Sequence, residues 1–381
     1  MLLLSDISVR FMQGAYLLDN AVTRTIARWL DPGSLLTGVL IMLVAIALTV
    51  TTIYLYLFYK KRNFFYTDRI RKLLETWITQ IIMEEEPESI STSKSFYKIL
   101  NNRVARQFAI DELIVCKKNF SGAVAENITA IYIQLGLKKY SLKKLATQNQ
   151  WHIRAKGIQE LYLMDQADVL TTIYKNTNSK NEFVRMEAQT GVIHLTGFPG
   201  LRFLDVISYP LTEWQQLKLL EQLRLYPKKE DISEKIPGWL QSKNETVVIF
   251  ALKLADEYQQ FSIRKQVIDC LVHPQKPVRR QAIKTLITLA DESTPAILLG
   301  YFNKEIFSNQ VFILEALRTI ATENEYEFLL NLLDHENDTI KLKAAVVLAE
   351  ISENGLAVLE KRGESQPEPY QRIYRHVKTV K

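Results

Sequence analysis

The sequence has 381 residues, which is enough for one large domain, two ordinary domains or an extended repeat array. Hydrophobic residues make up 47% of it and charged residues 24%, a composition that supports a packed core and excludes a chain disordered throughout. The net charge of +6 is concentrated in residues 1–150, whereas residues 151–350 hold more acidic than basic side chains. The long C-terminal part therefore lacks the basic footprint of a nucleic-acid reader.

Residues 1–34 form a flank ahead of the first long apolar run. Asp6 and Arg10 interrupt the apolar residues at the start, so the sequence does not predict a cleaved signal peptide. Between Gly14 and Leu30, apolar residues recur at helical spacing, which predicts an extracytoplasmic amphipathic helix at the membrane interface. A loosely ordered flank is the alternative. Ser34 is the expected N-cap of the helix that follows.

The run from Leu35 to Tyr59 contains no charged residue. A helix rises about 1.5 Å per residue and the hydrocarbon core of a bilayer is about 30 Å thick, so this run is long enough to cross it. A buried core helix need not exclude charge over such a length, and the absence of GxxxG argues against a dimerisation helix. We therefore predict a single transmembrane helix over residues 35–59.

A basic cluster follows this run. Its members are the membrane-flanking residues Lys60, Lys61, Arg62, Arg69, Arg71 and Lys72. On the N-terminal side, only Arg24 and Arg28 lie comparably close to the run. The positive-inside rule then places the C-terminal body in the cytoplasm. The expected localisation is the bacterial inner (cytoplasmic) membrane, with a single pass.

Residues 60–94 are expected to form a basic juxtamembrane helix and a linker. Apolar residues from Ile70 to Ile82 recur on one face, which predicts an amphipathic helix of about 18 residues. This helix can continue the span, lie along the membrane or pack on the first element of the body, and the sequence leaves all three open. The polar stretch from Glu84 to Ser93 predicts a short linker.

A repeated pattern organises residues 95–360. A β-branched residue is followed four positions later by alanine in the pairs Val184/Ala188, Val247/Ala251, Val278/Ala282 and Ile340/Ala344. The alanines are 63, 31 and 62 residues apart, close to multiples of 31. Weaker copies are expected at Ile153/Gly157, at Leu219 and at Phe312/Ala316. Such self-similarity predicts a stacked array, in which the small residue lets two helices approach and the branched residue fills the layer between units.

These units resemble HEAT repeats, in particular the short bacterial HEAT-like form also found in phycobilisome lyase-related proteins. The resemblance covers roughly residues 95 to 355. It implies an all-α fold, in which a single transmembrane helix is followed by an α-solenoid of HEAT-like helical hairpins. Each hairpin of such an array buries its apolar face only against its neighbours. Residues 361–381 are expected to form a basic C-terminal tail or a final capping helix.

Sequence motifs for catalysis are absent. The five histidines, His152, His194, His273, His335 and His376, form no HExxH motif and no metal-binding cluster. There is no phosphate-binding glycine loop and no GxSxG elbow. Cys116 and Cys270 are predicted to be reduced thiols. We therefore expect no catalytic, cofactor-binding or metal-binding residues, no cofactor and no enzymatic activity.

The leading hypothesis is a membrane-anchored cytoplasmic scaffold that binds a partner protein through its solenoid, in a bacterial machine for envelope polysaccharide synthesis or secretion. The expected partners are proteins of a membrane-associated complex and the lipid bilayer, without nucleic acid or a small-molecule substrate. The alternative is a membrane-tethered HEAT-like enzyme or nucleic-acid-modifying protein. Some HEAT-like arrays are DNA glycosylases that use tryptophans and a carboxylate, and Trp151, Trp214 and Trp239 are available here.

Overall fold

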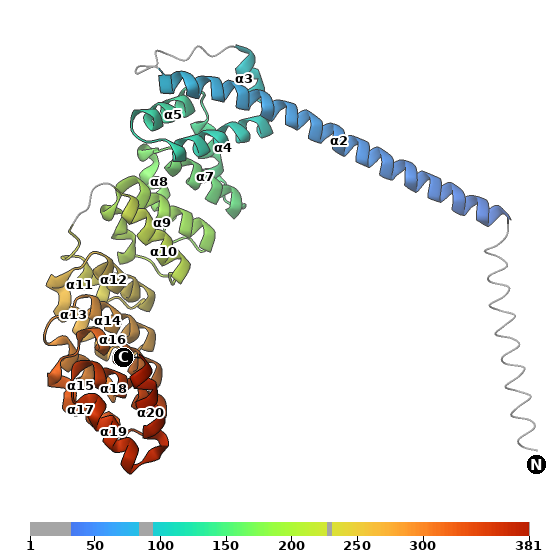
Figure 1. Ribbon diagram of the computed structural model, residues 1–381. Coiled ribbons are helices and arrows are strands. Elements are labelled where there is room, and N and C mark those ends of the chain that lie inside the picture. The colour runs from blue at the N-terminus through green and yellow to red at the C-terminus, as the bar shows by residue number, and fades with distance from the viewer. Residues whose placement is uncertain (1–31, 84–93, 227–230, 381) are drawn as a thin grey trace, which may run out of the picture. The chain divides into compact units, whose positions relative to one another are not determined.

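The structure is a computed structural model that describes residues 32–83, 94–226 and 231–380. It divides into two compact units, which we call unit 1 (Met1–Leu137) and unit 2 (Lys138–Lys381). All regular elements of the described ranges are helices, as the all-α prediction required (Figure 1). The amphipathic helix predicted between Gly14 and Leu30 and the linker predicted from Glu84 to Ser93 lie outside the described residues.

Unit 1 begins with α2 (Pro32–Met83), a single helix of 52 residues. It starts at Pro32, which suits a first helical position because the missing N–H needs no partner there. Ser34 therefore lies inside the helix, and the prediction that it caps the helix is wrong. The apolar run and the basic cluster belong to one helix, drawn in blue in Figure 1. This helix is long and apolar enough to cross a membrane, and none of its apolar window is buried within the structure.

The C-terminal half of α2 packs on the first helical hairpin. After α3 (Lys94–Leu100), this hairpin consists of α4 (Arg103–Asn119) and α5 (Ala123–Gln134), and α2 contacts both. Ile70 and Leu74 are fully buried there. Two of the three arrangements left open by the sequence thus occur together, because the helix both continues the apolar run and packs on the body. The side chains of residues 77–83 lie outside the described part of the chain.

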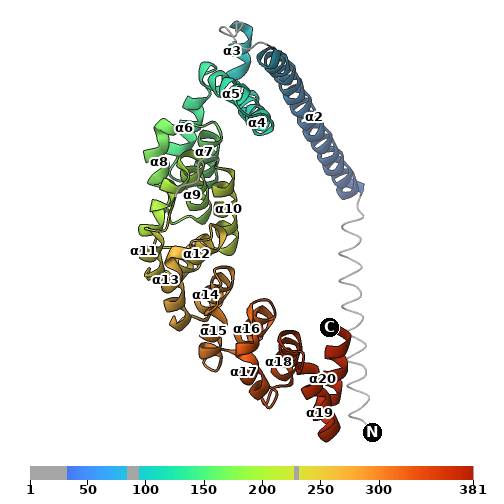
Figure 2. The same ribbon diagram turned by 60° about the vertical axis from the view of Figure 1, so that its left-hand side comes forward.

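Unit 2 stacks its helices in two layers (Figure 2). One layer holds short helices and 3₁₀ turns: α6 (Lys138–Ala146), η1 (Ala167–Val169), α8 (Leu170–Tyr174), η2 (Phe198–Asp205), α11 (Ile236–Leu240), η3 (Phe261–Ile263), α13 (Arg264–Asp269), η4 (Cys270–Val272), α15 (Thr294–Phe302), η5 (Glu323–Glu325), α17 (Tyr326–Leu332) and α19 (Gly355–Ser365). The other, which we call the long-helix layer, holds α7 (Trp151–Leu163), α9 (Glu182–Thr196), α10 (Glu213–Leu225), α12 (Glu245–Glu257), α14 (Lys276–Thr288), α16 (Phe307–Ile320), α18 (Asp338–Ile351) and α20 (Pro367–Val380).

Asparagine side chains set the starts of three long helices. Asn181, Asn244 and Asn337 are the N-caps of α9, α12 and α18, and each side-chain oxygen accepts a backbone N–H from the first turn. In α10, Thr212 and Gln215 form a reciprocal capping box instead. The three asparagines belong to the polar turns that precede the repeated pattern. The same local chemistry therefore begins successive repeats.

The third and seventh residues of successive long helices lie in the buried layer between repeats. The residues at these positions in α9, α12, α14 and α18 are the predicted pairs Val184/Ala188, Val247/Ala251, Val278/Ala282 and Ile340/Ala344, all at most 1% exposed. Gly157 is the seventh residue of α7, where an added Cβ would lie 2.5 Å from the Leu145 amide nitrogen of α6. Leu219 is the seventh residue of α10 and is 1% exposed. The predicted packing of small and branched residues is thus confirmed at these places.

The prediction for α16 is wrong in register. Its third and seventh residues are Asn309 and Ile313, which are 1% and 0% exposed, whereas the expected pair was Phe312 and Ala316. The difference arises because α16 begins at Phe307. Asn309 replaces the branched residue, and its amide nitrogen donates to Glu305 Oε2 at 2.8 Å. A hydrogen bond thus takes the place of an apolar contact in this repeat.

The C-terminal residues form the end of α19 and the helix α20 rather than an extended tail. Tyr370, Ile373 and Val377 are buried on the last hairpin. The Tyr370 hydroxyl donates to the Leu333 carbonyl oxygen at 2.8 Å. Helix α20 covers apolar surface that a further repeat would otherwise bury, which is the role of a capping helix.

Candidate partner-binding surface

The fourth residue of several long helices ties its helix to the preceding loop. The donors and their backbone acceptors, 2.7–3.1 Å apart, are Arg154 to Thr147, Arg185 to Ser179, Gln216 to Leu211, Arg279 to His273 and Gln310 to Phe302. In α7, α9 and α14 this residue is arginine and directly follows the branched residue of the repeat. An arginine after the branched residue is therefore a signal that the sequence itself carries. These guanidinium groups hold the repeats together and are therefore poorly placed to bind a ligand.

The fifth residue of five long helices is apolar and not fully buried, although three of these residues also pack against the core. We call Met186, Leu217, Ile249, Val311 and Leu342 the apolar stripe. Its members are spaced by 31, 32, 62 and 31 residues, and Arg280 of α14 interrupts it. All are partly or largely exposed, and Leu217 is 56% exposed. Apolar side chains repeated along one face are typical of a protein-binding surface.

Two aromatic side chains widen the stripe at its N-terminal end. Phe183 and Trp214 are the second residues of α9 and α10, which contact each other, and they are 50% and 69% exposed. The Phe183 ring stacks on Trp151 at the start of α7, with ring centroids 4.8 Å apart. Large aromatic groups of this kind are the usual anchors of protein interfaces.

Five ion pairs join neighbouring long helices. The pairs are Lys218–Glu187 at 3.1 Å, Arg224–Glu257 at 2.5 Å, Lys284–Asp256 at 3.9 Å, Lys343–Glu315 at 2.8 Å and Arg318–Glu350 at 2.5 Å. Their members lie 28 to 33 residues apart, about one repeat. These five basic groups are thus paired within the array.

Two carboxylates are held inside this layer. The Glu160 side chain is fully buried and accepts hydrogen bonds from Ser141 Oγ at 2.7 Å and Lys144 Nζ at 2.6 Å. Glu187 accepts a hydrogen bond from the Tyr162 hydroxyl at 2.8 Å. Burial and the Glu187 carboxylate raise the pKa of Tyr162 well above its ordinary value, so the hydroxyl remains a donor. Both carboxylates therefore join neighbouring helices.

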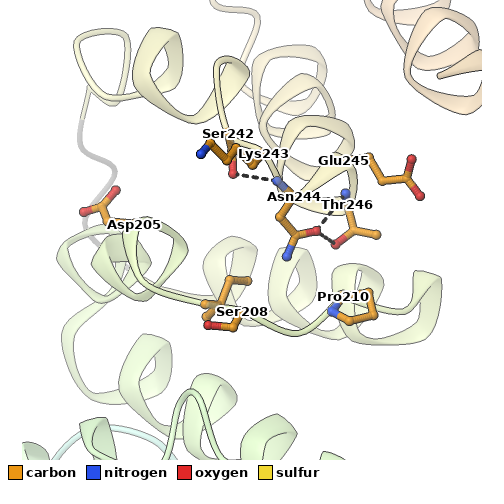
Figure 3. Close-up of a pocket in the computed structure, with 9 residues that line it drawn as sticks. Asp205, Ser208, Pro210, Ser242, Lys243, Asn244, Glu245 and Thr246 are labelled. Carbon is orange, nitrogen blue, oxygen red and sulfur yellow. Dashed lines mark hydrogen bonds between the residues drawn. The ribbon is translucent and has the colours of Figure 1, made fainter. Parts of the chain in front are cut away.

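An open pocket of about 620 Å³ lies between the residues after η2 and the start of α12 (Figure 3). Asn244 and Thr246 face this pocket, and both are used by the fold. The Asn244 amide donates to the Tyr209 carbonyl oxygen at 3.0 Å, and the Leu211 N–H donates to Thr246 Oγ1 at 2.8 Å. These bonds fasten the loop to the helix, so the polar lining is structural.

The three tryptophans of the alternative hypothesis are not brought together. Trp151 and Trp214 are exposed at the starts of different helices, whereas Trp239 is 4% exposed. The Trp239 indole donates to Asp205 Oδ1 at 2.7 Å beside the pocket of Figure 3. Lys243 is the one basic residue among the described residues that line this pocket, and two acidic residues lie with it. This arrangement does not provide basic walls around a carboxylate.

The membrane-flanking residues separate into two groups. Lys60, Lys61, Arg62 and Arg69 are exposed on α2. Arg71 and Lys72 are exposed too, but they make contacts within unit 1. The Arg71 guanidinium lies 5.3 Å from the Phe108 ring centroid and 3.8 Å from Glu112, and Lys72 lies 3.0 Å from Asp68.

Histidines and cysteines have structural surroundings. In the described ranges, no group of three or more His, Cys, Asp or Glu side chains is placed to hold a metal ion. His273 and His335 accept the N-cap backbone N–H of Gln275 and Asn337, at 3.1 and 3.0 Å. Burial raises the pKa of Cys270 to about 11, and Cys270 and the half-buried Cys116 are free thiols.

Comparisons with known proteins add no identity. No protein-family model matches the chain, and no curated protein matches its sequence. An engineered protein is similar in structure over 57% of this chain and 97% of its own, with 12% identity and a TM-score of 0.30. The complex of CpcE and CpcF of phycocyanin lyase from Nostoc sp. PCC7120 covers 73% of this chain and 97% of its own, with 13% identity and a TM-score of 0.25. The assignment as a helical-repeat protein rests on the hairpin stacking described above.

Proposed function

We propose that this protein is a membrane-anchored scaffold that binds a partner protein through the long-helix layer of unit 2. The observation that carries the proposal is the apolar stripe, because it recurs at the repeat period and its side chains are partly or largely exposed. Leu217, Phe183 and Trp214 are exposed along this face and would be covered in a complex. The proposed role is binding rather than catalysis, since the polar groups around the tryptophans and the pocket have structural partners.

Membrane anchoring would be the task of α2. Its large apolar side chains from Leu36 to Tyr59 are all more than half exposed, which is favourable only in lipid or against another protein. Ile70 follows Tyr59 by eleven residues of continuous helix, or about 16 Å. Lys60, Lys61 and Arg62 would lie at the headgroups, and by the positive-inside rule the body would then face the cytoplasm. The proposed site is the bacterial inner membrane, beside a polysaccharide or secretion machine.

The experiment is affinity capture in mild detergent, in which the full-length wild-type protein is compared with variants of the apolar stripe. Leu217→Ser combined with Ile249→Ser should weaken the affinity for the partner at least about tenfold, which corresponds to a loss of about 1.4 kcal/mol of binding free energy. The matched control is Phe261→Ser with Val272→Ser, because these residues are 57% and 64% exposed but lie in the short-helix layer. Equal capture by both double variants would refute binding through the stripe.

Topology is tested separately with a reporter fused after Lys381. A cytoplasmic signal is expected, and a periplasmic signal would refute the proposed orientation. Removal of residues 1–83 should release the protein from the membrane fraction if α2 is the anchor. Retention of the truncated chain in that fraction would show that anchoring does not depend on α2.

A further inference from the structure

We infer that the partner docks as a basic amphipathic helix on a patch formed by α9, α10 and α12. This inference rests on the proposed function and names the surface and the chemistry of the partner. The apolar centre of the patch is Phe183, Trp214 and Leu217, which are 50%, 69% and 56% exposed. Met186 and Ile249 of the apolar stripe continue it on both sides and are partly exposed. No other stretch of the described long-helix layer exposes three large apolar side chains on two adjacent helices.

The rim of this patch is acidic. Glu182, Glu213 and Glu245 are the first residues of α9, α10 and α12, and all three are exposed. Glu221 is also exposed and lies one helical turn beyond Leu217 on α10. Apolar groups at the centre with carboxylates on two sides match a partner that carries apolar anchors flanked by lysine or arginine.

The basic residues near the patch are held by the fold. Lys218 pairs with Glu187 at 3.1 Å, and Arg224 pairs with Glu257 at 2.5 Å. The Arg185 guanidinium donates to the Ser179 carbonyl oxygen and lies 4.6 Å from the centroid of the Tyr209 ring.

Each glutamate of the rim has a basic residue nearby. Arg185 and Arg224 interact electrostatically with Glu182 and Glu221, and Lys243 lines the pocket of Figure 3 together with Glu245. Lys253 is partly buried, and desolvation lowers its pKa although Glu213 lies nearby. Over α9, α10 and α12 the sequence nevertheless holds seven acidic side chains against four lysines and arginines, so the patch retains net negative charge for a partner.

Helical geometry suits this surface. Packed helices lie about 8–10 Å apart, so the fifth residues of the contacting helices α9 and α10 recur at about that interval. A partner helix that crosses them presents side chains at i and i+7, about 10.5 Å apart along its axis, to successive repeats. Leu or Phe at i, i+3, i+4 and i+7 would meet the apolar centre, with lysine or arginine opposite the glutamates.

The test measures binding of designed peptides to the full-length protein in nanodiscs of phosphatidylcholine. The probe is a fluorescein-labelled peptide of about three heptads with leucine at i, i+3, i+4 and i+7 and lysine at the other positions. A peptide with glutamate in place of lysine and a scrambled leucine–lysine peptide serve as comparisons. Fluorescence anisotropy should show at least about tenfold tighter binding of the leucine–lysine helix than of either comparison. Equal affinity of the three would overturn the inference.

Variants locate the site. Trp214→Ala with Leu217→Ser should weaken binding of the leucine–lysine helix at least about tenfold. Glu182→Lys with Glu245→Lys should weaken it as well and strengthen binding of the glutamate peptide. Phe261→Ser with Val272→Ser should change neither. Unchanged affinity in both patch variants, with wild-type thermal unfolding, would overturn the inference.

The two proposals fail separately. If the affinity capture depends on Val311 and Leu342 but not on Trp214 and Leu217, the scaffold function stands and this docking site is wrong. If the peptide binds at the patch but capture does not respond to any stripe variant, the docking site stands and the scaffold function is wrong.

Discussion

Gly157 of α7 lies so close to α6 that a Cβ at this position would be 2.5 Å from the Leu145 amide nitrogen. The same Cβ would lie 2.8 Å from the Ser141 carbonyl oxygen, and these backbone atoms cannot rotate away. The glycine thus does in α7 what alanine does at the seventh position of α9, α12, α14 and α18. It sets how closely the two helices of the hairpin approach.

Gly157→Ala should therefore destabilise the protein, by about 1–3 kcal/mol as for other overpacked sites. The matched control is Gly300→Ala in α15, where an added Cβ would have no atom within 4 Å. In this helix, alanine should stabilise by about 0.5–1 kcal/mol. Thermal unfolding of the full-length protein in detergent, followed by circular dichroism, measures both. An increased unfolding temperature for Gly157→Ala would contradict the close-packing argument.

A buried ion pair joins α14 to the loop between α15 and α16. Arg279 Nε lies 2.6 Å from Glu305 Oε1, and the two side chains are 14% and 2% exposed. Glu305→Ala leaves the guanidinium without its partner in a buried site, and should cost about 3–5 kcal/mol of unfolding free energy. Arg372→Ala, which removes an exposed pair with Glu368, should change stability by less than about 0.5 kcal/mol.

A double-mutant cycle separates pairing from burial at this site. Arg279→Met with Glu305→Met should be less destabilising than the sum of the two single changes, because no unpaired charge remains. Urea unfolding of the four proteins measures the coupling. If the changes in unfolding free energy caused by the two single substitutions were additive, Arg279 and Glu305 would contribute no specific interaction.

Asp334 helps to hold the capping helix α20 and the preceding helix α19 in place. Its hydrogen bond with Arg362 lowers the pKa of this carboxyl below 3.8, and the Tyr370 hydroxyl contributes. A depressed folded pKa adds stability that is present above pH 3.8 and is lost as the pH falls through the folded value. Asp334→Asn should lower the unfolding temperature at pH 7 and reduce its fall below pH 4. Glu353→Gln, on the exposed surface next to α19, should keep the wild-type pH profile.

Cys270 should resist alkylation in the folded protein. Burial raises its pKa from 9.0 to about 11, so at pH 8 its thiolate fraction is about 100-fold smaller than for the unperturbed thiol. Because the folded pKa is raised, the associated stability is complete below pH 9 and declines as the pH approaches 11. Iodoacetamide labelling of Cys116→Ser, read by mass spectrometry, should be slow in buffer and fast in urea. Rapid labelling in buffer would contradict the burial of this thiol.

Several features of the repeats could be predicted from the sequence because they depend on contacts within one helix or between neighbouring helices. Asn181, Asn244 and Asn337 cap helices through atoms two or three residues away. The branched residue and the alanine lie one turn apart, so their spacing of four recurs with the repeat. The prediction at Phe312 and Ala316 was wrong because this pair has the expected spacing but lies three residues, almost one turn, after the pair Asn309 and Ile313 that is buried. Only the start of that helix at Phe307 decides between the two registers.

The type of binding site could be predicted from the sequence, but its residues could not. The sequence indicated a scaffold with a binding face on its repeats, but it did not select residues. Exposure of Leu217 and Trp214 depends on what packs over the fifth and second positions of each helix, and no local pattern distinguishes these positions from buried ones. Charge pairing, as between Lys218 and Glu187, likewise joins residues about one repeat apart and hides basic groups that the composition counts as free.

The sequence by itself determined the all-α class, the repeat period, the polar turns before four of the long helices and the uncharged run from Leu35 to Tyr59. These features follow from hydrophobic periodicity, from capping and from the length of the uncharged run, all of which can be read from the linear sequence. Tertiary structure decided that α2 continues through the basic cluster and buries Ile70 and Leu74 against the first hairpin. It also decided which apolar side chains of the long helices remain exposed, because burial depends on the neighbours that stacking brings together.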